Sequence, residues 1–393
     1  MNLQLALLTL CQGFFLTNNV TFIAINGLVG LALAPSVWMA TLPITAYVAG
    51  SAIFAPLVAS HQRAWGRLRA FQLGLCVAMA STALCAWAAL HHQFWLLVAG
   101  AVLAGYYNAN AGLYRFAATE IVAPEFKERA ISWVLAGGIV GAVAGPNLAT
   151  LTRNALPAEF AGAYAALAVV ALCSLATISW IRFPPLVLPT AAAPGRPLRE
   201  IAAQPVFIVA ALACALGYGV MNLLMAATPI AMAMCSHPFA DTALVLEWHV
   251  LGMFVPSFFT GSLIKRFGAI RVMAAGVVLN AICIAVALSG VELERFLVAL
   301  FTLGVGWNFL FIGGTSLVTT AYRPEEKTSA QAAMDTTIFT TMTLSSFSSG
   351  ALVTTQGWTR LNLGSIVPLL LVAVALAWFV VRRRADLRVR PAS

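Results

Sequence analysis

Long apolar stretches recur along the whole chain, and each approaches the roughly 20 residues that an α-helix needs to span a bilayer. Of the 393 residues, 61% are hydrophobic and only 9% are charged, and the mean hydropathy is +0.91. A soluble globular chain is about a quarter charged. No alternating pattern of about ten residues suggests a barrel, and helices satisfy their own backbone groups in lipid. We therefore predict an all-α integral membrane protein.

The spacing of these stretches predicts twelve membrane-spanning helices. We expect them over residues 3–33, 37–60, 69–90, 94–120, 131–152, 162–183, 205–235, 243–264, 271–290, 295–322, 330–354 and 362–382. The Pro- and Ala-rich run "PPLVLPTAAAPGRPLREIAAQ" separates the sixth from the seventh and is typical of a linker. The predicted units are an N-terminal six-helix bundle (1–183), a cytoplasmic linker (184–204) and a C-terminal six-helix bundle with a basic cytoplasmic tail (205–393).

Short motifs that recur about 200 residues apart indicate an internal duplication. "RAWGRLR" (63–69) matches "KRFGAIR" (265–271), and "PEFKERA" (124–130) matches "PEEKTSA" (324–330). Because six is an even number of spans, both copies enter the membrane from the same side. Such a parallel repeat places the binding site near the membrane midplane, between the two halves.

The loop after the second predicted helix resembles a signature of the major facilitator superfamily, G-x-x-x-D-R-x-G-R-R. "SHQRAWGRLR" retains Arg63, Gly66, Arg67 and Arg69, and the second copy "GSLIKRFGAIR" retains Gly261, Arg266, Gly268 and Arg271. With twelve spans and a parallel repeat, the resemblance implies the facilitator fold and transport by alternating access. The acidic residue of the signature is missing, which puts the usual charge-relay latch in doubt at this site.

The placement of the basic residues predicts the topology. Of the 22 Lys and Arg residues, all but Arg115, Arg153, Arg295 and Arg360 fall in alternate loops and in the C-terminal tail. This asymmetry follows the positive-inside rule and puts both termini in the cytoplasm. The tail "VRRRADLRVRPAS" is therefore interpreted as a topology anchor, and no nucleic-acid partner is expected despite the net charge of +9. The N-terminal "MNLQLALLTLCQGFF" lacks the basic region of a signal peptide.

Other function classes find little support. The seven cysteines are scattered through apolar spans without disulfide or zinc spacing, so they are interpreted as small buried hydrophobes. No nucleophile–base or carboxylate pair has usable spacing, so an enzyme is not expected, nor is a prosthetic group. The lack of a sizeable extramembrane domain disfavours a sensor or scaffold. We expect a monomer in the lipid bilayer.

Charged side chains inside spans are costly and are therefore site candidates. Arg115 and Glu120 lie near the cytoplasmic end of their helix, and a structural or gating pair is preferred over substrate binding. Asp335 lies about one turn into its helix and either couples transport to protons or pairs with basic loop residues. The residues predicted for gating or coupling are Arg63, Arg115, Glu120, Lys265, Arg266 and Asp335.

Asparagines recur in the helices that border the cavity in this fold: Asn18, Asn19, Asn26, Asn108, Asn110, Asn222 and Asn308. They predict a polar but neutral lining. Sugar phosphates and dicarboxylates would need several convergent cations instead. The predicted cavity-lining set is Asn18, Asn108, Asn222, Trp307 and Asn308.

Two pairs of soft donors stand four residues apart: Met221 with Met225, and His249 with Met253. Each pair shares one helix face, and a rise of about 1.5 Å per residue puts Met225 level with Met253, with His249 above and Met221 below. Thioether and neutral imidazole suit Cu(I). The alternative is ordinary packing, because Met fills irregular cores and His249 could bond to Glu247, Asn222 or a backbone carbonyl.

The stretch "MNLLM…C…EWHVLGMF" resembles the CcoA-like copper importers, a bacterial facilitator subfamily with Met-x-x-x-Met and His-x-x-x-Met motifs. The resemblance implies copper import across the inner membrane in support of cytochrome oxidase maturation. Its implied metal set is Met221, Met225, His249, Met253 and Cys235. Related members look like riboflavin or siderophore carriers. For such an organic solute, the Asn lining and the aromatic residues Tyr106, Tyr107, Tyr218 and Trp307 would serve instead.

Overall fold

The computed structural model describes residues 2–184 and 195–389, and the segments between secondary-structure elements in these ranges are short. The N-terminal part holds α1 (Leu3–Leu33), η1 (Val37–Met39), α2 (Leu42–Leu90), α3 (Phe94–Ala111), α4 (Tyr114–Ala117), η2 (Ala118–Glu120), η3 (Pro124–Phe126), α5 (Lys127–Thr152) and α6 (Ala161–Ile178). The C-terminal part holds α7 (Leu198–Ala202), α8 (Pro205–Met234), α9 (Phe239–Phe254), α10 (Ser257–Phe267), α11 (Ala269–Leu288), α12 (Leu293–Val318), η4 (Pro324–Glu326) and α13 (Lys327–Val389). The predicted all-α fold is confirmed.

The predicted number of spans follows from where the long helices break. By length and composition the described residues hold ten spans, when α9 and α10 count as one span bent by 41°. Two of the ten are of double length. α2 is interrupted at Gly66 (φ 77°, ψ 172°) and α13 at Gly357 (φ 78°, ψ 173°). Glycine alone adopts this conformation without steric cost, so each of these helices is two spans, and the described residues contain twelve.

Several helix bounds differ from those predicted. The expected helix 243–264 begins earlier, at Phe239, and breaks before Ser257, because Pro256 has no N–H to continue the helix. The expected helix 94–120 is interrupted after Ala111 and continues as the short α4 and η2. The last helix extends to Val389, beyond the predicted end at 382.

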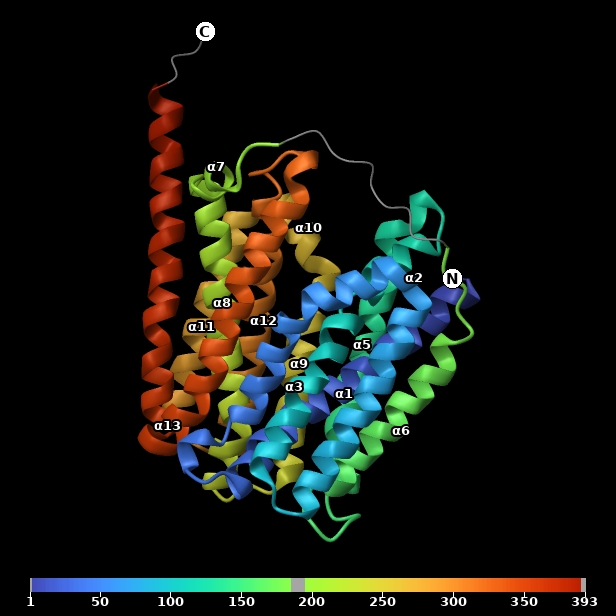
Figure 1. Cartoon of the computed structure of the whole chain (residues 1–393). Helices are drawn as coiled ribbons and strands as arrows, with labels where there is room; N and C mark the ends of the chain where they lie inside the picture. The colour runs from blue at the N-terminus through green and yellow to red at the C-terminus, as the bar shows by residue number, and fades with distance from the viewer. Residues whose placement is uncertain (1, 185–194, 390–393) are drawn as a thin grey trace.

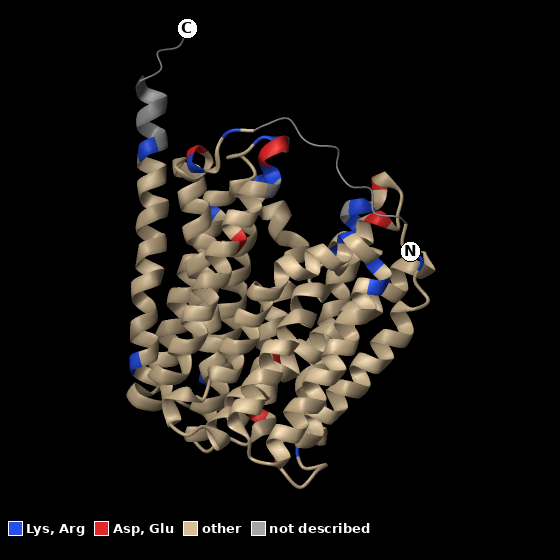
Figure 2. Ribbon diagram, viewed as in Figure 1, with Lys and Arg blue, Asp and Glu red and all other residues tan. Residues whose placement is uncertain are grey.

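The helices form two groups that meet at one end of the molecule (Figure 1). α2 packs on α3 and α1 on α5, while α8 packs on α13 and α11 on α12. The groups converge at the end where η1 lies, which we call the distal end. They separate at the end where α7 lies, which we call the linker end. Lys and Arg gather at the linker end (Figure 2). The division at 184–204 stays a prediction, and part of that segment lies outside the described residues.

Candidate functional site

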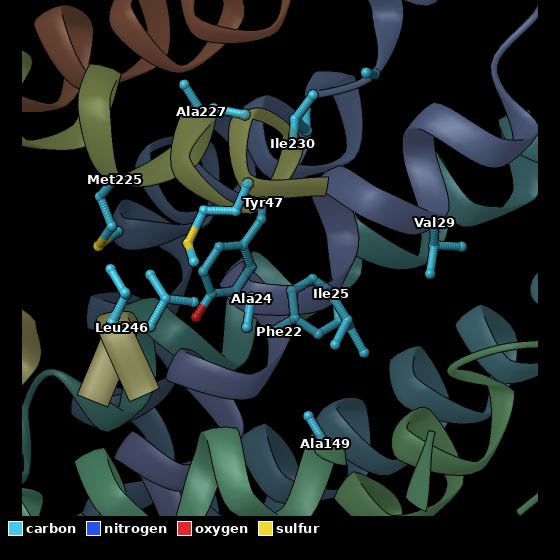
Figure 3. Packing of buried hydrophobic residues seen from close by; sticks show 14 of the residues in the cluster. Phe22, Ala24, Ile25, Val29, Tyr47, Ala149, Met225, Ala227, Ile230 and Leu246 are labelled. Carbon is cyan, nitrogen blue, oxygen red and sulfur yellow. The ribbon is translucent and has the colours of Figure 1, made fainter. Parts of the chain in front are cut away.

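The predicted thioethers lie in the hydrophobic interior. Met221, Met225 and Met253 are buried and belong to one cluster of packed side chains, in which Met225 lies with Leu246 and Tyr47 (Figure 3). The observed start of α9 changes their expected depths. At about 1.5 Å per residue, Met225 is level with His249, and Met221 with Met253. The predicted level pairing of Met225 with Met253 is therefore shifted by one turn.

His249 is fully buried and has one satisfied ring nitrogen. Its Nδ1 lies 2.7 Å from the Leu300 carbonyl oxygen on α12, so Nδ1–H donates there and Nε2 keeps a lone pair. Nε2 has no hydrogen-bond partner among the described residues. The partner is thus a backbone carbonyl, one of the three predicted possibilities. Glu247 accepts instead from Asn147 Nδ2, at 3.2 Å.

Cys235 stands apart from the methionines. It caps the end of α8 near the distal end and is half-buried, about 15 Å along the helix from Met225. Within residues 2–184 and 195–389, no three His, Cys, Asp or Glu side chains come together as a metal-ion site. The structure therefore does not join Cys235 to the predicted metal set.

Two of the predicted lining asparagines hold helices together instead. Asn222 donates to the Met342 carbonyl (3.1 Å) and to Ser345 Oγ (3.0 Å), which ties α8 to α13. Asn308 donates to the Met253 carbonyl (2.8 Å) and to Ser257 Oγ, and accepts from Thr260. The contacts of Asn308 brace the break between α9 and α10, and the N–H donors of both amides are occupied.

Asn19 and Asn108 belong to a polar network on the N-terminal half. Asn19 Nδ2 donates to the Tyr47 hydroxyl (2.7 Å) and to Asn108 Oδ1 (3.3 Å), and Asn108 Nδ2 donates to Ser51 Oγ (2.8 Å). Because the Tyr47 oxygen accepts from Asn19, its own O–H is left to donate elsewhere. Asn18 is buried, and its Nδ2 has no partner among the described residues.

An aromatic cluster faces this network from the C-terminal half. Tyr218 meets Trp307 edge-on at 5.1 Å between ring centroids, and Trp307 stacks on Phe311 at 5.1 Å with 9° between the planes. Trp307 is buried, and its Nε1–H has no acceptor among the described residues. A buried donor without a partner calls for an explanation, and a ligand acceptor would supply one.

Two charged residues complete the arrangement. Arg115 and Asp335, one from each half, are solvent-exposed and lie within electrostatic range of each other. Tyr218 is close enough to interact electrostatically with both Arg115 and Tyr47. We call Tyr47, Arg115, Tyr218, Trp307 and Asp335 the central site. It combines aromatic faces, unpaired N–H and O–H donors and one charge of each sign, which suits a planar polar solute.

A cavity of about 580 Å³ lies at the distal end, away from the central site. α1, α2, α8, α9 and the loop after α5 surround it. Phe160 and Phe239 touch there across the two halves, with 4.8 Å between ring centroids. The Arg153 guanidinium lies over both rings, at 5.4 and 5.7 Å. These contacts close the distal end.

Known proteins resemble the chain over nearly its full length. The riboflavin transporter RfnT of Brucella anthropi is 38% identical over 378 residues, which cover 95% of each chain. The profile of the Major Facilitator Superfamily matches residues 236–393. The chain belongs to the major facilitator superfamily. It is a multi-pass membrane transporter, as the sequence resemblance predicted, but these comparisons do not confirm the copper-importer subfamily.

Two solved structures share the fold of this chain. A bacterial homologue of the iron transporter ferroportin has a TM-score of 0.72 in its inward-facing state, with 14% identity over 96% of this chain and 99% of that chain. Its outward-facing state gives 0.63, with 15% identity over the same shares.

The gating residues of this facilitator pair differently from the prediction. Glu120 binds Arg67, not Arg115: Arg67 Nη2 lies 2.6 Å from Oε1 and Nε lies 3.1 Å from Oε2. Arg67 also donates to Gln62. Among the ion pairs within the described ranges, none joins Asp335 to Lys265 or Arg266, and the Arg266 guanidinium lies over the Phe267 ring instead. No ion pair of the described residues includes Arg63.

Sequence reasoning missed Tyr47 and Ser51. Neither stands in a motif, and their role depends on α1, α2 and α3 meeting at one level. A hydroxyl four residues from another on one helix face was the available signal. Such a pattern is too common in membrane helices to single out a site.

Proposed function

We propose that this facilitator carries riboflavin or a flavin of similar shape across the inner membrane. The proposal rests on the identity of 38% with a riboflavin transporter over 95% of both chains. Facilitators of one fold carry many solutes, so the chemistry of the site must also fit. This function corresponds to the organic-solute alternative of the sequence analysis.

The central site supports a flavin by its chemistry. An isoalloxazine ring can stack on the aromatic cluster of Tyr218 and Trp307, a contact worth about 0.5–1.5 kcal/mol beyond the buried area. The Trp307 N–H and the Tyr47 O–H can donate to ring carbonyls or ribityl oxygens. Arg115 can bind the imide edge of the ring. A neutral solute needs no further charged ligand, which agrees with the scarcity of charge in the spans.

The topology and the gate at the linker end belong to the same proposal. The basic residues gather at the linker end, and by the positive-inside rule we infer that this end and both termini lie in the cytoplasm. Arg115 and Asp335 lie on opposite halves at this end without a direct ion pair between them in the part that the structure describes. When the linker end closes, they approach each other and form the gating contact, with Lys265 and Arg266 outside it.

Binding of riboflavin to the purified protein tests the proposal, with quenching of flavin fluorescence as the measurement. We expect Trp307→Ala to weaken binding about 5- to 150-fold, because removing the aromatic side chain on which a nucleobase stacks costs about 1–3 kcal/mol. Trp248→Ala is the matched control, since Trp248 is exposed and packs against Phe301 outside the central site. No binding by the unmodified protein, or equal loss in both variants, would contradict the proposal.

A second candidate cargo is a soft monovalent cation such as Cu(I). His249 favours it: Nδ1 is fixed on a backbone carbonyl, and the buried Nε2 is left unpaired, which is how metal-binding histidines are commonly oriented. The test is cellular copper content in a deletion strain that expresses His249→Ala or Met225→Ala. Copper accumulation equal to that of the unmodified protein in both variants would exclude this cargo.

A further inference from the structure

One side chain of the N-terminal half reaches into the backbone of a helix of the C-terminal half. Thr41, directly before α2, is buried; its Oγ1–H donates to the Ser346 carbonyl at 2.8 Å, and its Oγ1 accepts from the Gly350 N–H at 2.9 Å. These two backbone groups are four residues apart in α13. They are thus the acceptor and the donor that pair in a regular α-helix, where the N–H of one residue bonds to the carbonyl four residues before it. The Thr41 hydroxyl therefore bridges the Ser346 carbonyl and the Gly350 N–H at the distal end.

The residues around this bridge allow the two halves to approach closely. A Cβ at Gly350 would lie 2.3 Å from Thr41 Oγ1 and 2.8 Å from its backbone nitrogen, so only glycine leaves room for the bridge. One turn away, Phe347 meets Trp38 of η1 edge-on at 5.9 Å. The two halves therefore touch through backbone, hydroxyl and ring within one short segment.

Two further hydroxyls at this contact are unsatisfied. Ser346 Oγ and Ser349 Oγ are fully buried and have no hydrogen-bond partner among the described residues. A buried hydroxyl without a hydrogen-bond partner destabilises the state in which it is buried. Water would satisfy both if the distal end opened. The segment therefore carries polar groups that suit two states, one closed by Thr41 and one hydrated.

We propose that Thr41 is the latch of the distal gate, and that it holds the gate shut by bridging the Ser346 carbonyl and the Gly350 amide of α13. In the closed state, the hydroxyl satisfies both backbone groups. In the open state, the two groups bond to each other along the helix, and the serine hydroxyls meet water. The latch acts whatever solute the transporter carries.

The test measures how often the gate opens, without any substrate. Ser349→Cys is introduced into the full-length protein after the accessible Cys76, Cys173 and Cys235 are replaced by serine, and the rate of maleimide labelling is followed in detergent. We expect Thr41→Val to raise this rate about thirtyfold, because two hydrogen bonds of about 1 kcal/mol each leave the closed state. Thr41→Ser keeps the hydroxyl and labels at the original rate.

Gly350→Ala and the native Cys85 make the result decisive. Gly350→Ala keeps the Thr41 residue, but the added methyl group occupies the position of its hydroxyl. We expect this variant to raise the labelling rate of the cysteine at position 349 as much as Thr41→Val does. Cys85 is fully buried where α2 packs on α3 within the N-terminal half, with its Sγ 3.9 Å from the Leu97 carbonyl, and its labelling reports loss of the fold. The proposal is contradicted if Thr41→Val leaves the labelling rate unchanged, or if Thr41→Ser raises it as much as Thr41→Val does. It is also contradicted if the labelling rate of Cys85 rises by the same factor. Flavin binding does not enter any of these outcomes.

Discussion

At the scale of single residues, Tyr47 shows how a ligand group can be prepared by its neighbours. The Asn19 amide donates to the Tyr47 oxygen, at 2.7 Å, and so fixes the hydroxyl with its proton directed away. Phe22 packs against the same ring at 5.1 Å between centroids. The position of the hydroxyl is thus set before any solute arrives, which reduces the entropy lost on binding.

Tyr47→Phe tests this role. We expect flavin affinity to fall about tenfold, since the variant loses one hydrogen bond to the solute and the acceptor of Asn19. Isothermal titration or fluorescence quenching measures the change.

Tyr164→Phe is the matched control. Tyr164 is equally buried, but its hydroxyl donates to Asn26 Oδ1 at 2.7 Å, outside the central site. We expect this variant to lower the thermal unfolding midpoint and to leave affinity unchanged. If the two variants lose affinity alike, Tyr47 has no special role in binding.

The sequence predicts that a polar side chain inside a span needs a hydrogen-bond partner, but it does not predict well which group that partner is. The sequence indicates that a histidine inside a span needs a partner, and His249 has one in the Leu300 carbonyl. It could not indicate that Asn222 and Asn308 bind backbone carbonyls, because an amide that lines a cavity and one that ties two helices look the same in a sequence. Only the packing of α8 on α13 and of α9 on α12 distinguishes them.

At the scale of elements, glycines divide helices that hydropathy alone would join. Gly66 and Gly268 stand at matching positions of the repeat, and both have positive φ, 77° and 85°. Each ends one helix and begins the next on the same side of the fold. The repeat that was found from short motifs thus has a counterpart in backbone conformation, although the division of the chain into two units stays a prediction.

Gly268→Ala measures the cost of this conformation. With φ 85° and ψ 150°, the position is nearly restricted to glycine, so we expect a loss of about 1–3 kcal/mol in stability. A Cβ there would meet no atom within 4 Å, so any loss comes from the backbone and not from a clash.

Gly261→Ala is the control in the neighbouring helix. Gly261 lies within α10, has ordinary helical conformation and also has open space around its Cβ position. Alanine there should stabilise the protein by about 0.5–1 kcal/mol. Thermal unfolding midpoints in detergent should therefore shift in opposite directions, and equal shifts would contradict the argument.

Helix positions could be predicted from hydropathy, whereas helix ends depended on single residues. The break at Pro256 lies inside an apolar run, and its neighbours continue the same pattern, so the pattern predicted one helix where two are bent by 41°. A proline inside a predicted span is the signal that could have corrected this error. A separate error, the predicted start at residue 243 where α9 begins at Phe239, shifts the expected level of the methionines relative to His249 by a turn.

At the scale of the whole molecule, the two halves use different contacts at the linker end. The N-terminal half pairs Arg67 with Glu120, within its own bundle. The C-terminal half binds the end of the linker: Arg196 donates from Nε and Nη2 to the Glu326 carboxylate at 2.8 Å each, and from its backbone N–H at 2.8 Å. The repeat places Phe126 opposite Glu326, so the linker contact has no equivalent in the first half.

This contact predicts a pH dependence. Hydrogen bonds from Arg196, and then from the Arg323 backbone, lower the pKa of the Glu326 carboxyl from its ordinary 4.5. A lowered pKa means that the stabilisation is complete above 4.5 and is lost as the pH falls below it. Glu326→Gln removes the titrating group, so its unfolding midpoint should depend less on pH on the acid side. An unchanged acid profile would show that the contact adds nothing to stability.

The latch at the distal end has a consequence for tolerance to substitution. Thr41 contacts main-chain atoms of α13, and every residue type supplies the carbonyl at position 346. In a saturation scan scored by transport, position 346 should therefore accept any small side chain. Position 41 should accept only serine and threonine, and position 350 only glycine. Two positions 309 residues apart along the chain would then be constrained together, although no side chain of one touches a side chain of the other.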